Sequence, residues 1–302
     1  MKIKVLKFGG TSVGSIEAIK RSADIIHDWS KKSKVIAVLS AMSGETDRLI
    51  NLTKSFSKNP NPIDFDNAIS SGENVSCALM SICLNNQKIK AKSLLSWQIP
   101  IITSSEHMKS RILSINKKFL YDELENFEVL LIPGFQGINN KGELTTLGRG
   151  GSDTSAVAVA AAMETECIIY TDVEGVFTTD PNIVPKAKKI NKISYEEMLE
   201  LASQGAKVLQ TRSVELAMRK NTKLSVRSSF KPKKIGTMIT DEKSVLENNT
   251  VSGITYSKDE AKITLSRVQD KPGVSSKIFG PLAKGNINVD MILQNHLELH
   301  FL

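Results

Sequence analysis

The chain has 302 residues, a formal net charge of +8 and a hydrophobic content of 40 %, and it lacks both a signal-peptide pattern and a long apolar run. This composition is typical of a globular protein, and no stretch approaches the roughly 20 apolar residues of a membrane span. Its lysines are spread along the whole chain without a long basic run, so we expect no nucleic-acid partner and no membrane partner. Three scattered cysteines favour a reducing compartment, and we predict a cytoplasmic protein.

Short β-branched runs alternate with longer helical patterns from the N-terminus onward. We predict strands at residues 3–8, 35–39, 129–132, 167–170 and 224–226, and helices at 15–30, 47–56, 74–84, 153–163, 195–202 and 208–219. This alternation predicts an α/β protein: a three-layer αβα sandwich with a mostly parallel central sheet. In such sheets ligands bind beyond the carboxyl ends of the strands. The loops that follow Phe8, Leu39, Ile132 and Tyr170 should therefore meet at the site.

The last part of the chain has a different pattern. We assign residues 1–230 to one large domain, residues 231–260 to a polar linker, and residues 261–302 to a small module with a strand–helix–strand pattern. About 40 residues cannot bury a core of their own, so this module needs a partner or the large domain.

A glycine-rich segment stands out before the helix at 153–163. Gly148 to Gly151 run directly toward a helix N-terminus, where backbone N–H groups can bind an anion. Ser152 can cap that helix, Asp153 adds a negative charge to its first turn, and Arg149 can bind a carboxylate or a phosphate. An ordinary capped helix after a flexible turn is the alternative, but it would need neither Arg149 nor so much glycine.

Three other segments carry weaker signals. Lys7 with Gly9 and Gly10 ends the first strand, where glycine N–H groups and a lysine can face phosphates, although such a turn is also common for structural reasons alone. Glu73 opens a helix and is equally well explained as a first-turn acid. The segment 171–181 follows a strand and reads either as a turn or as a nucleotide contact. The sequence has no P-loop, no dinucleotide-binding glycine pattern and no His or Cys pair at metal-ligand spacing.

Taken together, seven segments in order resemble the aspartate kinases of the amino-acid kinase family. They are KFGGTSVGS, VLSAMSGETDRLI, SSGE, PGFQG, TLGRGGSDTSAVA, YTDVEGVFTTDPNIVPKA and EEMLELASQGAKVLQTRSVE. A further segment, DKPGVSSKIFGPLAKGNINVDMILQN, resembles the start of an ACT regulatory module. The resemblance covers nearly the whole chain and implies the amino-acid kinase fold with a partial ACT-like βαβ piece. It also implies an enzyme that phosphorylates the side-chain carboxylate of L-aspartate with ATP, at the first step of lysine, threonine and methionine biosynthesis.

The resemblance also implies roles for the residues at the matching positions. Lys7 would lie against the transferring phosphoryl group, and Asp153 would organise the centre around it. Arg149 would bind the α-carboxylate of aspartate, and Glu73 would bind its α-ammonium group. The other substrate-side residues implied are Ser40, Thr46 and Ser152. ATP, which carries its Mg²⁺, would be bound by Lys7, Gly9, Gly10, Thr171, Asp172, Phe177, Asp180 and Lys207, and no residue is predicted to be a separate metal site.

Two departures from the family pattern set further expectations. Asn182 stands where the family usually has an arginine after TTDP, so one nucleotide contact should be weaker or come from elsewhere. Residues 296–302 do not match the family's continuation of the ACT module. We therefore expect weak or absent feedback inhibition by lysine or threonine, and a weakened homo-oligomer.

Two alternatives remain open from the sequence alone. Another member of the amino-acid kinase family is one, although Glu73 argues against an acetylated substrate, whose neutral amide would give it no charge partner. A catalytically impaired, amino-acid-binding remnant is the other, although the joint presence of Lys7, Glu73, Arg149 and Asp153 argues against decay of the site.

Overall fold

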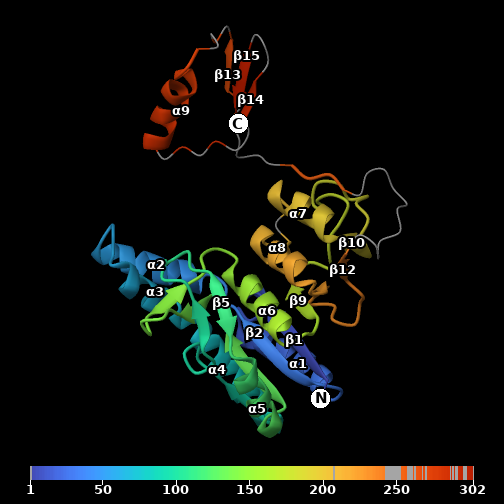
Figure 1. Cartoon of the computed structure of the whole chain (residues 1–302). Helices are drawn as coiled ribbons and strands as arrows, with labels where there is room; N and C mark the ends of the chain where they lie inside the picture. Colours follow the sequence, from blue (N-terminus) through green and yellow to red (C-terminus); the bar gives the residue numbers. More distant parts are fainter. Residues whose placement is uncertain are drawn as a thin grey trace. The chain divides into compact units, whose positions relative to one another are not determined.

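The computed structural model (Figure 1) describes residues 2–206, 208–241 and 253–256, and after these residues 261, 263–266, 268, 271–285, 287, 289, 292–294 and 298–301. The chain divides into two compact units, residues 1–255 and residues 256–302.

The larger unit is built on a central sheet. Among the described residues this sheet has eight strands in the order β10-β12-β11-β9-β1-β2-β6-β3. Their bounds are β1 (Ile3–Phe8), β2 (Lys34–Leu39), β3 (Ala91–Ser93), β6 (Val129–Pro133), β9 (Cys167–Thr171), β10 (Lys192–Ser194), β11 (Leu224–Ser228) and β12 (Thr237–Thr240). Of the neighbouring pairs, β11 and β12 are antiparallel and the others are parallel. The predicted mostly parallel sheet is confirmed.

Helices cover both faces of this sheet, which gives the predicted αβα sandwich (Figure 1). Side chains of α5, α6, α7 and α8 pack on one face with Val5, Val38 and Ile132. Side chains of α1 and α4 pack on the other face with Leu6 and Leu39. The helix bounds are α1 (Ile16–Ser30), α4 (Ser71–Asn86), α5 (Lys117–Asn126), α6 (Gly151–Ala162), α7 (Tyr195–Ser203) and α8 (Thr211–Lys220). Because alternate residues of the central strands are buried on opposite faces, these strands are mostly apolar, and Lys4 and Lys7 of β1 are exceptions.

Local sequence signals account for several helix starts. Ser15 accepts a hydrogen bond from the Ala18 N–H at the start of α1. Ser194 and Glu197 form the predicted capping box of α7, with the side chain of each bonded to the backbone N–H of the other. The backbone N–H groups left free at a helix start are satisfied in this way, which sets where these helices begin.

Four short strands form a second sheet that the sequence analysis does not predict. Its order is β5-β4-β7-β8, with β4 (Ile101–Thr103), β5 (Ile112–Ile115), β7 (Gln136–Ile138) and β8 (Leu144–Thr146). Runs of three or four residues are too short to show a periodic pattern. Two more helices, α2 (Glu45–Phe56) and α3 (Pro62–Ile69), lie before α4 in the chain, and α3 contacts β8.

The predicted linker over residues 231–260 needs a correction. Thr237–Thr240 within it is β12, which pairs with β10 and β11 inside the central sheet. The main sheet therefore continues beyond residue 230. The sequence does not indicate this strand because its threonines are polar. In the structure Thr237 and Thr240 are buried, and the Thr237 hydroxyl donates to the Ile190 carbonyl.

The smaller unit holds β13 (Ile263–Ser266), α9 (Val274–Lys284), β14 (Ile292–Gln294) and β15 (Glu298–Phe301). Its strand order is β13-β15-β14, and both pairings are antiparallel. The predicted strand–helix–strand order is present, and an additional strand, β15, lies between the other two. This strand falls within residues 296–302, to which the sequence analysis assigns no structure.

Candidate active site

A cavity of about 650 Å³ opens at the carboxyl ends of the central strands. Its lining comes from the loops after β1, β2 and β6, from α2 and α3, and from the glycine-rich turn before α6. This volume is within the range of small-molecule sites, and the location is the one that the parallel sheet predicts.

Backbone hydrogen bonds fix the loops that reach this cavity. The Ser40 N–H donates to the Phe8 carbonyl over 3.1 Å, and the Gly134 N–H donates to the Leu39 carbonyl over 2.9 Å. The Gly9 N–H donates to the Tyr170 carbonyl over 3.3 Å. Each loop thus leaves its strand while still bonded to the neighbouring strand, so the four loops expected to meet do begin side by side.

Lys7 and Asp153 form an ion pair in the cavity. The Lys7 Nζ lies 2.6 Å from Asp153 Oδ1, and both side chains are about nine-tenths buried. Lys7 comes from β1 and Asp153 from the first turn of α6, so the fold joins two segments that are far apart in the chain. The pair places a fixed positive charge next to a helix N-terminus.

The glycine-rich turn differs from the prediction in one respect. Helix α6 begins at Gly151 with Gly150 as its N-cap residue, so Ser152 lies inside the first turn and is not the cap. Gly148 and Gly150 have φ angles of +79° and +71°, a region that favours glycine, and this explains why the turn is glycine-rich. Ser152 lines the cavity, and a Cβ on Gly134 would lie 2.7 Å from its Cβ.

Glu73 lies at the start of α4 and lines the same cavity, although it is only 3 % exposed. Burial raises the pKa of its carboxyl to about 7, and the bond from the Ala41 N–H opposes this rise. Its Oε2 is buried and has no hydrogen-bond partner among the described residues. A buried carboxylate oxygen without a partner is costly, so this site is suited to a ligand that brings a positive charge or a proton donor.

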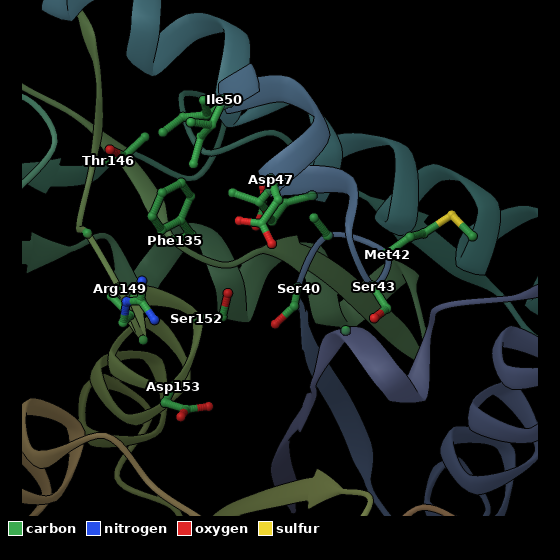
Figure 2. A pocket seen from close by; sticks show the side chains of 18 of the residues that line it. Ser40, Met42, Ser43, Asp47, Ile50, Phe135, Thr146, Arg149, Ser152 and Asp153 are labelled. Carbon is green, nitrogen blue, oxygen red and sulfur yellow. The ribbon is translucent and has the colours of Figure 1, made fainter. Parts of the chain in front are cut away.

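Arg149 supplies a positive charge at the side of the cavity opposite Ser40 and Ser43 (Figure 2). Its side chain is exposed, and it makes no hydrogen bond or ion pair with the part of the chain that the structure describes. Thr46 lines the cavity from α2. The predicted substrate-side residues therefore all lie around one cavity, with Gly10 and Lys7.

Of the predicted nucleotide-side residues, Lys7, Gly9 and Gly10 lie at the end of β1, and the others that the structure describes lie at the end of β9 and beyond it. Thr171 is the last residue of β9, next to the strand that leads to Gly9, and its hydroxyl donates to Asp172. Farther along, Phe177 forms an isolated antiparallel β-bridge with Lys189. Asp180 accepts the Asn182 N–H over 2.8 Å in a turn. These four residues do not line the described cavity, and Lys207 lies outside the described residues.

The structure adds cavity residues that the sequence analysis does not single out. Phe135, Met108, Asp47 and Gln210 line the cavity. Phe135 lies within PGFQG, one of the segments that resemble the family, and this resemblance could have indicated it. His107 is given no role by the sequence, yet its Nδ1 lies 2.8 Å from a carboxylate oxygen of buried Asp66. This pair is separated widely in the chain, so no local pattern could indicate it.

The part of the chain that the structure describes contains no group of three or more His, Cys, Asp or Glu residues arranged to hold a metal ion. Nor does any described helix combine the length and the apolarity needed to cross a membrane.

Comparisons with known proteins identify the family to which the chain is similar. Residues 2–228 match the amino acid kinase family, and residues 266–302 match an ACT domain. The chain is 49 % identical over 298 residues to the aspartate kinase of Pseudomonas putida, which covers 98 % of this chain and 72 % of that protein. It is 49 % identical over 296 residues to the aspartokinase of Helicobacter pylori, covering 96 % and 73 %. Among solved structures, E. coli aspartokinase III in complex with lysine and aspartate has a TM-score of 0.83 at 27 % identity, covering 99 % of this chain and 78 % of that one.

Proposed function

This chain belongs to the amino acid kinase family and, within it, to the aspartate kinases, and from that premise we propose that it transfers the γ-phosphoryl group of ATP to the side-chain carboxylate of L-aspartate. The printed names of its relatives support the reaction. The binding of aspartate and ADP by a similar structure, E. coli aspartokinase III in its R-state, supports the two substrates. That structure has a TM-score of 0.76 and is 26 % identical to this chain.

One observation carries the proposal for the site. The cavity has an acidic and a basic side chain that complement the two charged ends of an amino acid, and Lys7 is a separate cation in the same cavity. Glu73, with a buried oxygen that lacks a partner in the described part of the chain, binds the α-ammonium group of aspartate. Arg149, whose guanidinium has no partner among the described residues, lies on the other side and binds the α-carboxylate. With both ends of the amino acid held, its side chain is left to approach the Lys7–Asp153 pair.

The chemistry of the reaction explains why these residues suffice for phosphoryl transfer. A carboxylate with a solution pKa near 4 is already ionised at neutral pH, so the reaction needs no general base. Its difficulty is the approach of an anionic nucleophile to an anionic phosphoryl group. Lys7 and the backbone N–H groups at the start of α6 lower this repulsion and orient the reacting oxygens. Asp153 holds the Lys7 ammonium in place and removes no proton.

For the nucleotide, we propose a site that runs from Gly9 and Gly10 to Thr171 and Asp172, with Phe177, Asp180 and Lys207 on its nucleoside and phosphate sides. The close pairing of β1 with β9 supports the first part of this site. Mg²⁺ would arrive on the phosphates of ATP, near Asp153, which is paired with Lys7. When bound, the ion would neutralise phosphate charge.

Steady-state ADP release tests the proposed function. We expect the purified chain with Mg-ATP to release ADP in the presence of aspartate, and to do so at least about tenfold more slowly with glutamate, because its longer side chain misplaces the carboxylate. A reaction without any amino acid gives the background. Equal rates with and without aspartate, from a protein that melts cooperatively, would contradict the proposal.

Removal of the metal gives a second measurement on the same assay. We expect excess EDTA to abolish aspartate-dependent ADP release, and excess MgCl₂ to restore it, because uncompensated phosphate charge repels the nucleophile. Full activity in EDTA would show that the reaction does not need a divalent ion.

Three further expectations from the sequence stay proposals. They are an ACT-like module distinct from the catalytic domain, a cytoplasmic location, and a homo-oligomer.

A further inference from the structure

The carboxylate of Asp66 is the centre of a buried network beside the cavity. This residue of α3 is 0 % exposed. Its oxygens accept hydrogen bonds from the Thr146 hydroxyl at 2.6 Å, the Thr146 N–H at 3.1 Å and the Met108 N–H at 3.1 Å, and His107 Nδ1 lies 2.8 Å away. A buried carboxylate is stable only where hydrogen-bond donors surround it. Asp66 therefore holds residues 107–108 and Thr146 together.

Arg212 of α8 binds the same two segments from another side. Its Nη1 donates to the Leu147 carbonyl over 2.8 Å, and its Nη2 donates to the Ser110 carbonyl over 2.7 Å. Ser110 in turn donates to the Thr146 carbonyl through its N–H and its hydroxyl, over 3.0 Å and 2.9 Å. Residues 107–110 and 146–147 are therefore bonded to each other and held at their two ends by Asp66 and Arg212. We call these two residues the loop clamp.

Arg149 lies two residues after this clamped segment. It lies between Gly148 and Gly150, which both have positive φ angles, and glycine allows the backbone more freedom than any other residue. No described side chain bonds to Arg149, so its position depends on its backbone anchors. One anchor is the Leu147 carbonyl bond to Arg212. On the other side, Gly150 packs so closely against the N-cap residue of α8 that an added Cβ would lie 2.0 Å from Gln210 Cγ.

We propose that Asp66 and Arg212 are positioning residues for aspartate: they hold the wall formed by Met108 and Thr146 and set the place from which Arg149 reaches the substrate. This inference rests on the proposed function, since it needs Arg149 to bind the α-carboxylate. Neither clamp residue lines the cavity, so both act through the backbone.

Kinetics with each substrate varied separately test the loop clamp. For Arg212→Met and for Asp66→Asn we expect the KM for aspartate to rise about fivefold or more, while the KM for ATP stays within about twofold, because small displacements of a binding group weaken only the substrate it holds. A purely structural role would lower the active fraction. That would reduce kcat with both substrates and leave both KM values unchanged.

Two matched substitutions serve as controls. Arg219→Met removes an exposed ion pair with Glu215 on the same helix as Arg212, and Asp64→Asn changes an exposed carboxylate on the same helix as Asp66. Neither should change the KM for aspartate. If Asp66→Asn does not fold, Arg212→Met, which is partly exposed, still decides the question.

The outcomes separate the two proposals. Wild-type turnover with aspartate, together with unchanged aspartate KM values in the folded clamp variants, would overturn the loop clamp alone. A wild-type protein that neither turns over aspartate nor is stabilised by it in a thermal melt would overturn the proposed function and the loop clamp with it. A selective rise in the aspartate KM supports both.

Discussion

We expect Lys7→Ala to lower kcat about a hundredfold, equivalent to about 2.7 kcal/mol of barrier. In the structure the Lys7 ammonium is nine-tenths buried and lies 2.6 Å from Asp153, so its charge acts in a site with little water. Its removal takes away the cation that offsets the repulsion between the two reacting anions. It also leaves Asp153 unpaired at the place where the phosphoryl group must arrive. The measurement is steady-state ADP release at saturating ATP and aspartate.

Lys4→Ala is the matched control for this substitution. Lys4 lies on the same strand and forms an ion pair of its own with Glu166, also partly buried, but it does not line the cavity. We expect its kcat to stay within about twofold of the wild type, since an ion pair outside the site affects only stability. A Lys7→Ala enzyme with the kcat of the Lys4→Ala enzyme would remove Lys7 from the mechanism.

The sequence predicts the parts of this protein that depend on local periodicity. The strand patterns of β1, β2, β6 and β9 and the capping box of α7 need only neighbouring residues, and the structure confirms them. Strands of three residues such as β4 and β7 carry no period, and they form because other strands offer them partners. The threonine-rich β12 was missed for a related reason: its polar side chains are buried by tertiary contacts.

The residues of the candidate site also fall into those that local sequence indicates and those that it does not. Glycines with positive φ angles and a charged residue at a helix start can be read locally, and this indicated Gly148, Gly150, Arg149 and Asp153. The partners of buried charges could not be read, because they lie on distant segments. Asp66 is the clearest case: it looks like an ordinary helical acid in the sequence, and its donors come from residues about 40 and 80 positions away.

We expect Glu73→Gln to raise the KM for aspartate by about tenfold to a hundredfold, because a neutral amide replaces the charge partner of the α-ammonium group. In the wild type the aspartate KM should itself depend on pH. Burial raises the pKa of Glu73 to about 7, so below that pH the carboxyl is mostly protonated in the free enzyme. The aspartate KM should therefore rise as the pH falls below about 7, and Glu73→Gln should lose this dependence. An unchanged KM with an unchanged pH profile would exclude Glu73 from the substrate site.

The same substitution should stabilise the fold, and the sign follows from proton linkage. The pKa of Glu73 is about 7 in the folded chain and 4.5 in the reference state, so between these values the folded state binds more protons than the unfolded state. The free energy of unfolding then falls as the pH rises through this window, by an amount on the order of 3 kcal/mol at most. Glutamine does not ionise and avoids this loss. Urea melts at pH 5 and pH 8 should therefore give Glu73→Gln an advantage over the wild type at pH 8 and little at pH 5. An advantage that is equal at both pH values would mean that Glu73 is not the group that titrates. A variant that is more stable but binds aspartate poorly would show that this buried charge is kept for the substrate and not for the fold.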